Sequence, residues 1–253
     1  MFQRQGPAAY KANLKATKLV CSALGNPESG LRFVHVAGTN GKGTVCHMVA
    51  AVLQEAGYRV GLFTSPHLVD FRERIRVNGA CIPEVDVIDF VERWQLAKGA
   101  WGTPSFFELT FGMALDHFSR VKCDIVVLET GMGGRLDSTN VIVAPEVAVV
   151  TNIGLDHQAF LGPDIRSIAK EKAGIFKQGA PVVLGPMRPE AQSEMLSAAL
   201  RTSSEVHFAC DCDDEVQCYL NPSSSFVTCA NIGTAIATLN VLQSQGWDSV
   251  SYT

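Results

Sequence analysis

Short apolar runs and amphipathic segments alternate along most of the chain. The apolar runs are rich in β-branched residues, which favours buried strands. They predict strands at Phe33–Ala37, Val60–Thr64, Ile125–Glu129, Val147–Asn152 and Val182–Gly185. The intervening segments predict helices at Thr44–Glu55, Glu84–Leu96, Phe106–Arg120, Ile165–Ala173, Glu190–Arg201 and Ile232–Gln243. This alternation predicts an α/β fold with a doubly wound, mostly parallel sheet that helices cover on both faces.

The pattern changes after residue 202. Glu205–Ala209 and Phe226–Thr228 resemble short strands around an acidic loop, so we expect a small β-rich flap near residues 205–229. The loop contains Cys210 and Cys212, and a further cysteine follows them. Because this spacing is not standard for zinc, the default interpretation is a solvated acidic loop and not a metal site.

A glycine-rich segment lies between the first predicted strand and the first predicted helix. A tight turn that leads into a helix N-terminus presents several backbone N–H groups to an anion, so this order predicts a phosphate loop. Lys42 would add positive charge for the β- and γ-phosphates, and Thr44 a hydroxyl for magnesium. The usual mononucleotide loop has Ser or Thr directly after the lysine, whereas Gly43 intervenes here. The candidate nucleotide-binding residues are Gly38, Thr39, Asn40, Gly41, Lys42, Gly43 and Thr44.

Polar or glycine-rich segments also follow three other predicted strands. They are Thr64–His67, Glu129–Arg135, and Thr151–Asn152 with His157 shortly after it. Because the carboxyl ends of parallel strands lie at one edge of a sheet, we expect these segments to meet at one rim. The convergence favours a ligand-binding protein over a purely structural one.

Composition narrows the class of protein. Of 253 residues, 47% are apolar and 18% are charged, which predicts a packed core. The net charge of −4 argues against a nucleic-acid binder that relies on a basic surface. No apolar stretch is long enough to span a bilayer, and the N-terminus lacks a signal-peptide pattern. The eight cysteines are then best read as reduced thiols, and we expect a cytoplasmic protein.

Six strings of residues together resemble the folylpolyglutamate synthase/dihydrofolate synthase family of the Mur ligase superfamily. They occur in the family's order at His35–Thr44, Thr64–Leu68, Phe71–Arg76, Gly131–Asn140, Leu155–His157 and Glu171–Ile175. Gly43 is also this family's form of the phosphate loop. The resemblance implies that residues 1–253 form an ATP-binding domain of the Mur ligase central type.

The resemblance implies an ATP-dependent ligase that joins L-glutamate to dihydropteroate, to folate or to both. ATP would phosphorylate the carboxylate of that substrate, and the glutamate amine would attack the acyl phosphate. Family members continue into a C-terminal glutamate-ligase domain, so we expect this chain to supply the ATP half alone. Two alternatives stay open: a truncated nucleotide-binding module without turnover, and a Mur-type ligase for another carboxylate. The Phe71–Arg76 string favours folate.

The resemblance also implies roles for individual residues. Lys42, Lys172 and His157 would be catalytic, with Lys172 carbamylated by carbon dioxide. Two magnesium sites are implied, and the metal ligands would be Ser65, Glu129 and His157. Asn231 would contact ATP. The implied substrate residues are Ser105, Phe106, Phe107, Glu108, Leu136, Asp137 and Ser138. The partners would be small molecules, with no nucleic acid or membrane, and the protein would be a monomer.

Ordinary alternatives exist for three of the charged residues. His157 would suit a loop histidine that caps a turn. Glu129 would suit a rim carboxylate that pairs with Arg135. Lys172, next to Glu171, would suit a surface helix pair.

Two further groups also have two interpretations. Phe106 and Phe107 suit a hydrophobic core as well as a stacking platform for a flat ring. Arg72, Arg74 and Arg76 stand at alternate positions, which suits an exposed strand face or a site for an anionic substrate tail.

Overall fold

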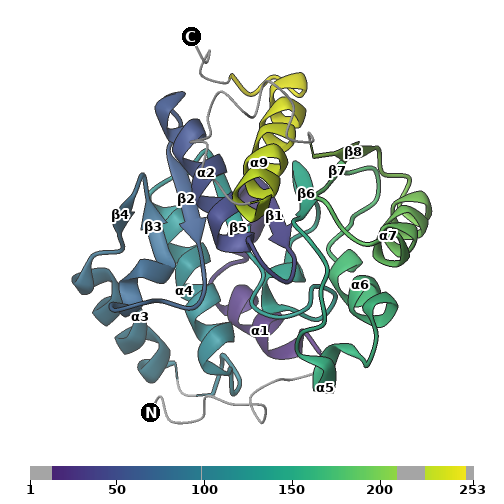
Figure 1. Cartoon of the computed structure of the whole chain (residues 1–253). Coiled ribbons are helices and arrows are strands. Elements are labelled where there is room, and N and C mark those ends of the chain that lie inside the picture. Colours follow the sequence, from purple (N-terminus) through teal and green to yellow (C-terminus); the bar gives the residue numbers. More distant parts are fainter. Residues whose placement is uncertain (1–12, 98, 210–225, 249–253) are drawn as a thin grey trace.

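The computed structural model describes residues 13–97, 99–209 and 226–248 (Figure 1). In this part of the chain a single sheet has the strand order β4-β3-β2-β5-β1-β6-β7-β8. Its strands are β1 (Phe33–Ala37), β2 (Val60–Phe63), β3 (Ile75–Val77), β4 (Ala80–Cys81), β5 (Ile125–Glu129), β6 (Val147–Val150), β7 (Val182–Leu184) and β8 (Val206–Phe208). Six strands run parallel from β2 to β8, and β3 and β4 form an antiparallel edge.

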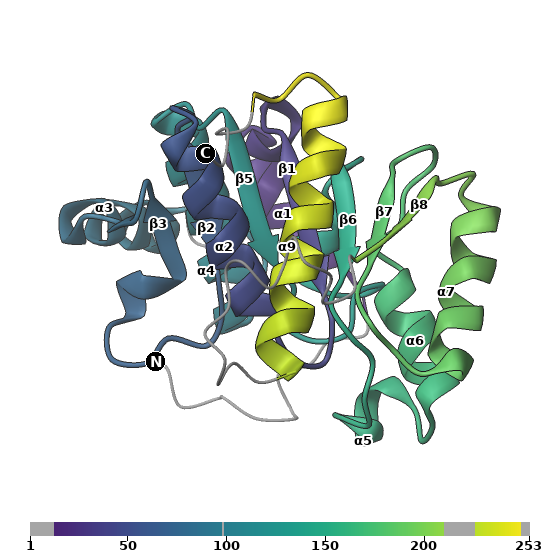
Figure 2. The ribbon, with the colours of Figure 1, turned by 45° about the horizontal axis from the view of Figure 1, so that its top comes forward.

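Helices cover both faces of this sheet. The α-helices are α1 (Lys15–Ala23), α2 (Lys42–Glu55), α3 (Glu84–Leu96), α4 (Phe106–Arg120), α5 (Gln158–Leu161), α6 (Ile165–Ala173), α7 (Pro189–Arg201) and α9 (Phe226–Ser244). The described residues also form three 3₁₀ turns, η2 (Pro27–Gly30), η3 (Phe71–Arg74) and η4 (Ser138–Val141). Figures 1 and 2 show α2 and α9 side by side on one face, with α1 and α4 on the other. The predicted doubly wound, mostly parallel α/β fold is therefore confirmed.

The central strand β1 divides the core between the two faces. All five of its residues are buried. Val34 and Val36 pack in the cluster that α2 and α9 cover, whereas Phe33 packs in the cluster that includes α1 and α4. Ala37 belongs to a third cluster with α6 and α7. Because alternate side chains point to opposite faces, a strand buried on both sides reads as one continuous apolar run, which is the pattern that predicted it.

The strand predicted at Glu205–Ala209 is present as β8, but the predicted small β-rich flap near residues 205–229 is wrong where the structure describes it. Residues 206–208 form β8, which pairs in parallel with β7 and extends the main sheet. Residues 226–228 begin α9, six residues earlier than predicted. Short apolar runs do not separate strand from buried helix by periodicity, and α9 is apolar around most of its circumference. The Cys210–Cys212 loop lies outside the described residues.

The arginine series at residues 72–76 is not an exposed strand face. Phe71–Arg74 forms η3, because Asp70 and Glu73 make a reciprocal capping box with the backbone. Arg72 pairs with Asp70 at 2.7 Å, while Arg74 is buried. Local capping therefore overrides the period-2 pattern of the arginines.

The other predicted elements agree with the structure to within two residues, apart from α9. The helix after the phosphate loop starts at Lys42 and not Thr44, because Gly41, with φ +82°, occupies its N-cap position. The pattern did not predict α5 or the β3–β4 hairpin, whose helix and strands are only two to four residues long. It also missed α1, although that helix has nine residues, as α6 does.

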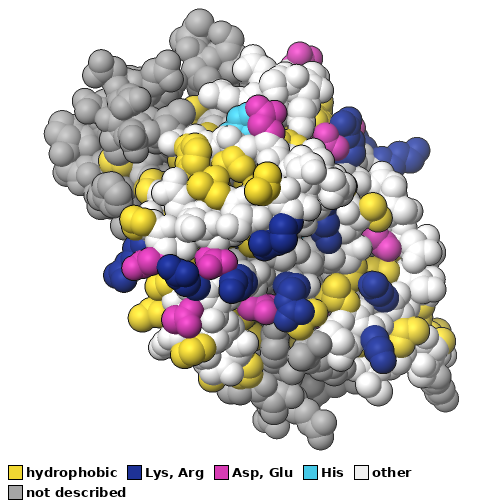
Figure 3. Space-filling view, turned by 90° about the vertical axis from the view of Figure 1, so that its right-hand side faces the viewer, with side chains coloured by type: hydrophobic (Ala, Val, Ile, Leu, Met, Phe, Trp, Pro, Cys, Tyr) yellow, Lys and Arg dark blue, Asp and Glu magenta, His cyan; other side chains and the backbone are white. Residues whose placement is uncertain are grey.

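The described residues also bear on the membrane and cysteine predictions. None of their helices combines the length and apolarity that crossing a membrane requires. The five described cysteines, Cys21, Cys46, Cys81, Cys123 and Cys229, are free thiols. On the side where α6 and α7 lie, acidic and basic side chains are interleaved (Figure 3), and Lys170 of α6 lies 3.9 Å from Glu194 of α7.

Candidate nucleotide site

The phosphate loop turns sharply between β1 and α2, and two of its glycines are required by their surroundings. A Cβ atom at Gly38 would lie 1.9 Å from Thr151 Oγ1, and one at Gly41 would lie 2.1 Å from Asn231 Oδ1. Both glycines also have positive φ angles. A side chain at Gly38 would force the loop away from the segment that follows β6. A side chain at Gly41 would strain the backbone and displace the Asn231 side chain of α9.

The segment after β6 fixes the loop by hydrogen bonds. The amide of Thr39 donates to the carbonyl of Asn152 at 2.9 Å, and the amide of Asn40 donates to Asn152 Oδ1 at 2.9 Å. Thr151 Oγ1 donates to the carbonyl of Asn40 at 2.6 Å, and the amide of Gly154 donates to Thr39 Oγ1 at 2.9 Å. Two of the predicted rim segments therefore meet, and one of them fixes the shape of the other.

Two lysines converge on one carbonyl of the loop. Lys42 Nζ donates to the Gly38 and Thr39 carbonyls at 3.1 and 3.2 Å, and Lys172 Nζ donates to the Gly38 carbonyl at 2.7 Å. Lys172 is only 3% exposed, so it is not half of a surface helix pair. Burial, together with the charge of Lys42, lowers the pKa of Lys172 to about 8, although Asp156 and Asp137 oppose the shift. Two ammonium groups at one loop form a strong centre for an anion.

Glu129 brings a carboxylate to the same loop from the end of β5. It is buried, and its Oε2 accepts a hydrogen bond from the Ser65 amide at 2.9 Å. A Cβ atom at Gly43 would lie 3.5 Å from Oε2, so the residue after Lys42 directly faces this carboxylate. Burial raises the pKa of Glu129, while the Ser65 amide and the charge of Lys42 lower it. Its oxygens are hard donors of the kind that magnesium binds.

The other two predicted metal ligands occupy different surroundings. Ser65 is adjacent to Glu129 through its backbone. His157 has φ 49° and stands at the N-cap position of α5, with its half-exposed ring 3.5 Å from Asp156 Oδ2. In the described part of the chain, no three His, Cys, Asp or Glu side chains gather as a metal-binding group. The set of Ser65, Glu129 and His157 stays a prediction.

The first predicted substrate segment begins α4. Ser105 and Glu108 form a capping box, with the Ser105 amide donating to Glu108 Oε2 at 2.6 Å and the Glu108 amide donating to Ser105 Oγ at 3.3 Å. Phe106 stacks at a tilt on Phe71, with ring centroids 5.8 Å apart. Phe107 packs edge-on against Phe63 at 5.7 Å. Both rings therefore have aromatic neighbours, and neither interpretation of them is contradicted.

The second predicted substrate segment follows β5. Asp137 is buried at the N-cap of η4, where its Oδ1 accepts from the Thr139 amide at 3.0 Å and its Oδ2 accepts from the Met132 amide at 2.8 Å. Burial raises the pKa of Asp137, and these hydrogen bonds oppose the shift. Leu136 is half-buried and Ser138 is buried.

The C-terminal end of α6 clamps this second segment. Arg135 pairs with Glu171 at 2.8 Å, and not with Glu129. The Arg135 amide also donates to the Glu171 carbonyl at 2.7 Å. A Cβ atom at Gly174 would lie 2.3 Å from Arg135 Cβ, so the two backbones touch. The segment that carries Asp137 is thereby fixed to the helix that carries Lys172.

Three further residues belong to the site, and the sequence pattern indicates them only as members of a rim segment or of the arginine series. Asn152 and Thr151 fix the loop, as described above. Arg74 is buried, donates from Nε to His67 Nδ1 at 2.8 Å, and lies 5.4 Å from the centre of the Phe106 ring. The capping box at Asp70 and Glu73 folds this segment so that Arg74 is buried. The sequence of that box was therefore a signal from which the buried arginine could have been predicted.

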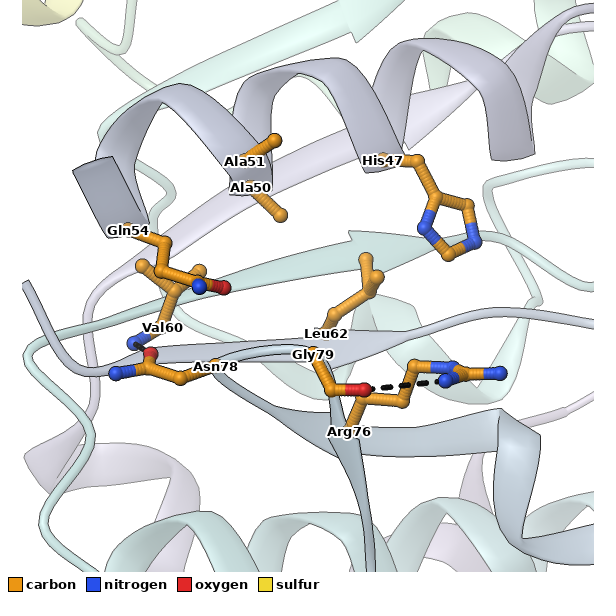
Figure 4. Close-up of a pocket in the computed structure, with 9 residues that line it drawn as sticks. All are labelled: His47, Ala50, Ala51, Gln54, Val60, Leu62, Arg76, Asn78 and Gly79. Atoms are coloured by element: carbon orange, nitrogen blue, oxygen red, sulfur yellow. Dashed lines mark hydrogen bonds between the residues drawn. The ribbon is translucent and has the colours of Figure 1, made fainter.

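A separate cavity of about 130 Å³ lies beside α2, between that helix and the β2–β3 strands (Figure 4). Figure 4 shows the His47 ring and the Arg76 guanidinium facing one another across it. Burial and the charge of Arg76 lower the pKa of His47. None of the predicted site residues lines this cavity.

A parallel α/β sheet with a phosphate loop after its central strand defines the phosphate-loop class of nucleotide-binding domains. Residues 36–184 match the Mur ligase middle domain, and the chain therefore belongs to the Mur ligase family. This confirms the superfamily that the six strings indicated.

Within that family the chain is similar to folate ligases. It is 43% identical over 209 residues to the dihydrofolate synthase/folylpolyglutamate synthase of Bacillus subtilis (strain 168), which covers 79% of this chain and 48% of that protein. It is 43% identical over 186 residues to the Escherichia coli (strain K12) protein of the same name, covering 74% of this chain and 43% of that one. The chain spans about half the length of the curated relatives it matches.

The fold is similar to solved folate-ligase structures as well. An FPGS-AMPPCP-folate complex superposes with a TM-score of 0.85 and 31% identity, covering 98% of this chain and 66% of that one. The resemblance inferred from the sequence strings is confirmed by sequence and by structure.

We predict that Gly41→Ala weakens nucleotide binding about tenfold or more, because the new Cβ meets Asn231 and φ +82° is strained for alanine. Calorimetric titration with ATP and magnesium would measure the effect. Gly154→Ala is the matched control, since its Cβ would make only ordinary contacts, at 3.5 Å or more, with Thr39. Equal affinities for the two variants would contradict the role of Gly41.

Proposed function

We propose that this chain supplies the ATP, magnesium and pterin-substrate half of a ligase that joins L-glutamate to dihydropteroate, to folate or to both. The observation that carries the proposal is the pair of lysines at Gly38, opposed by the buried carboxylate of Glu129. The names of the relatives support the substrate class. The proposal includes a monomeric, cytoplasmic protein that acts on small molecules.

The proposed reaction has two steps. A carboxylate oxygen of the acceptor attacks the γ-phosphorus of ATP, and ADP leaves. The amine of L-glutamate then attacks the carbonyl carbon of the acyl phosphate, inorganic phosphate leaves, and the amine loses a proton as the amide bond forms. Phosphoryl transfer depends on position and on charge neutralisation, so the protein must mainly hold and shield its substrates.

The phosphate loop would bind the nucleotide. The loop amides and Lys42 would bind the β- and γ-phosphates, in the manner of other phosphate loops. Asn231 touches the loop beside Gly41 and would contact ATP from α9. Lys172 would lie near the same phosphates, since both lysines already donate to the Gly38 carbonyl. Unmodified it would add a second positive charge, and carbamylated it would offer oxygens to a second metal ion.

The residues beside the loop fit magnesium. Glu129 offers one buried carboxylate next to the loop, and magnesium commonly binds one or two carboxylates together with phosphate oxygens and water. Ser65 would add an oxygen from the adjoining segment, and His157 a nitrogen, which is a less typical donor for this ion. When bound, the metal would neutralise charge on the phosphates.

The acceptor would lie against the segments that follow β5 and begin α4. Ser105–Glu108 and Leu136–Ser138 are the proposed substrate residues. A Cβ atom at Gly131 would lie 2.6 Å from Phe107 Cζ, so these two segments are in contact. Phe106 and Phe107 offer flat apolar rings and Asp137 a carboxylate, which suits an aromatic ring that carries polar edges.

We predict that the chain forms an activated acceptor from ATP, magnesium and dihydropteroate. Hydroxylamine would replace glutamate as the nucleophile and trap the acyl phosphate as a hydroxamate, which mass spectrometry detects. We expect hydroxamate and ADP in equal amounts, and only with acceptor present. ADP without dependence on dihydropteroate or folate would contradict the proposal. Nucleotide binding without turnover would favour a binding module, and activation of a different carboxylate another Mur-type ligase.

We predict that Glu129→Gln weakens magnesium-dependent nucleotide binding by about 10- to 100-fold, because a neutral amide replaces the carboxylate that faces the loop. Titration with ATP at increasing magnesium concentration would measure it. Glu55→Gln, an exposed position at the end of α2, is the control and should bind like the parent chain. Unchanged magnesium dependence in Glu129→Gln would remove this residue from the metal site.

We predict that Lys172 gains the mass of one carbon dioxide in bicarbonate buffer. Carbon dioxide adds to a neutral amine, and a lysine whose pKa is about 8 is far more often neutral near pH 8 than an ordinary lysine. The modified fraction should rise between about pH 7 and about pH 9, as the amine loses its proton. Native mass spectrometry with Lys172→Met and Lys170→Met as a pair would locate it. A gain that persists in Lys172→Met would refute this site.

A further inference from the structure

His35 is a polar residue in the middle of the central strand. It is completely buried, and it pairs in register with Leu128 of β5 and Ala148 of β6. Phe33 and Ala37, the flanking residues that point to the same side of the sheet, are apolar. A fully buried imidazole among such neighbours requires a partner for its polar atoms.

That partner connects His35 to the segment after β5. His35 Nε2 lies 2.8 Å from Thr139 Oγ1, and Thr139 Oγ1 donates to Asp137 Oδ1 at 2.5 Å. The other oxygen of Asp137 accepts from the Met132 amide at 2.8 Å. A chain of hydrogen bonds therefore runs from the central strand, three residues before the phosphate loop, to the glycine segment 131–134.

The directions of these hydrogen bonds follow from the donors available. Asp137 accepts from the Met132 and Thr139 amides, which favours its ionised form. The single hydroxyl proton of Thr139 then goes to Asp137, so Thr139 must accept from His35. Burial lowers the pKa of His35 to about 3, so the ring is neutral and carries its proton on Nε2. Among the described residues Nδ1 has no hydrogen-bond partner.

We propose that His35 is a positioning residue that, through Thr139, fixes the Asp137 carboxylate and the glycine segment 131–134 relative to the phosphate loop. The inference rests on the proposed function in one respect, since Asp137 belongs to the proposed acceptor site. The glycine segment has little room to adjust: a Cβ atom at Gly131 would lie 3.2 Å from Asp137 Oδ2 as well as against Phe107. A shift of Asp137 would therefore move the surface offered to the acceptor.

The first test compares Thr139→Val with Thr139→Ser. Valine has the shape of threonine but no hydroxyl, so it breaks both side-chain hydrogen bonds, whereas serine keeps them. We expect Thr139→Val to weaken dihydropteroate binding, or raise its KM, about tenfold while changing ATP affinity less than about twofold. Thr139→Ser should stay near the parent chain. Equal losses for both ligands, or no loss, would overturn the proposal.

The second test does not depend on the acceptor. The ¹⁵N chemical shifts of His35 should report a neutral ring protonated on Nε2 in the parent chain, and a proton on Nδ1 would overturn the proposal. His35→Gln places an amide donor near the position of Nε2, whereas His35→Leu does not. We expect amide hydrogen exchange at Met132 to be faster in His35→Leu and in Thr139→Val than in their matched partners. Unchanged exchange would overturn the proposal.

These measurements separate the two possible failures. If the parent chain bound neither dihydropteroate nor folate, the proposed function would fail, while the ring protonation and the exchange at Met132 would still decide the role of His35. If acceptor binding were normal and His35 carried its proton on Nδ1, only the role of His35 would fail. Should Thr139→Val not fold, the His35→Gln and His35→Leu pair gives the same decision.

Discussion

The convergence of two lysine ammonium groups on the carbonyl of Gly38 is the constraint on which the site depends. Burial of one ammonium group and the charge of the other make this pair costly, and together they lower the pKa of Lys172. The arrangement persists because the loop carbonyls accept from both ammonium groups and the Glu129 carboxylate lies close by. An anion at the loop would offset the repulsion between the two ammonium groups. This relief would contribute to the free energy of nucleotide binding.

Much of this arrangement was predictable from the sequence. The continuous apolar runs predicted the buried strands of the sheet, and the order of strand, glycine turn and helix predicted the phosphate loop. Because parallel strands end at one edge, the same strands predicted that the polar segments after them would meet at one rim. Lys42 was found because it follows the glycine turn after the first strand, and Glu129 because it ends a strand. The rim segment Thr151–Asn152 was found, but its hydrogen bonds to the phosphate loop were not. They join residues 111 to 113 positions apart, and sequence spacing does not reveal such contacts.

The failures have local physical causes. The capping box at Asp70 and Glu73 turned an alternating arginine pattern into a 3₁₀ turn and buried Arg74. The residues that begin α9, at positions 226–228, are aromatic and β-branched, which is typical of a strand, yet their backbone is helical. No role was predicted for His35, which lies in the first of the six strings. A single polar residue in a strand buried on both faces must find a hydrogen-bond partner, so its position was itself a signal.

The contacts between α6 and the segment after β5 link the two proposed halves of the site. Gly174 touches the backbone of Arg135, and Glu171 binds both the side chain and the amide of Arg135. Lys172 lies on one of these two elements and Asp137 lies close to Arg135 on the other. The separation between the lysine at the phosphate loop and the carboxylate at the proposed acceptor site is therefore set by direct backbone contacts.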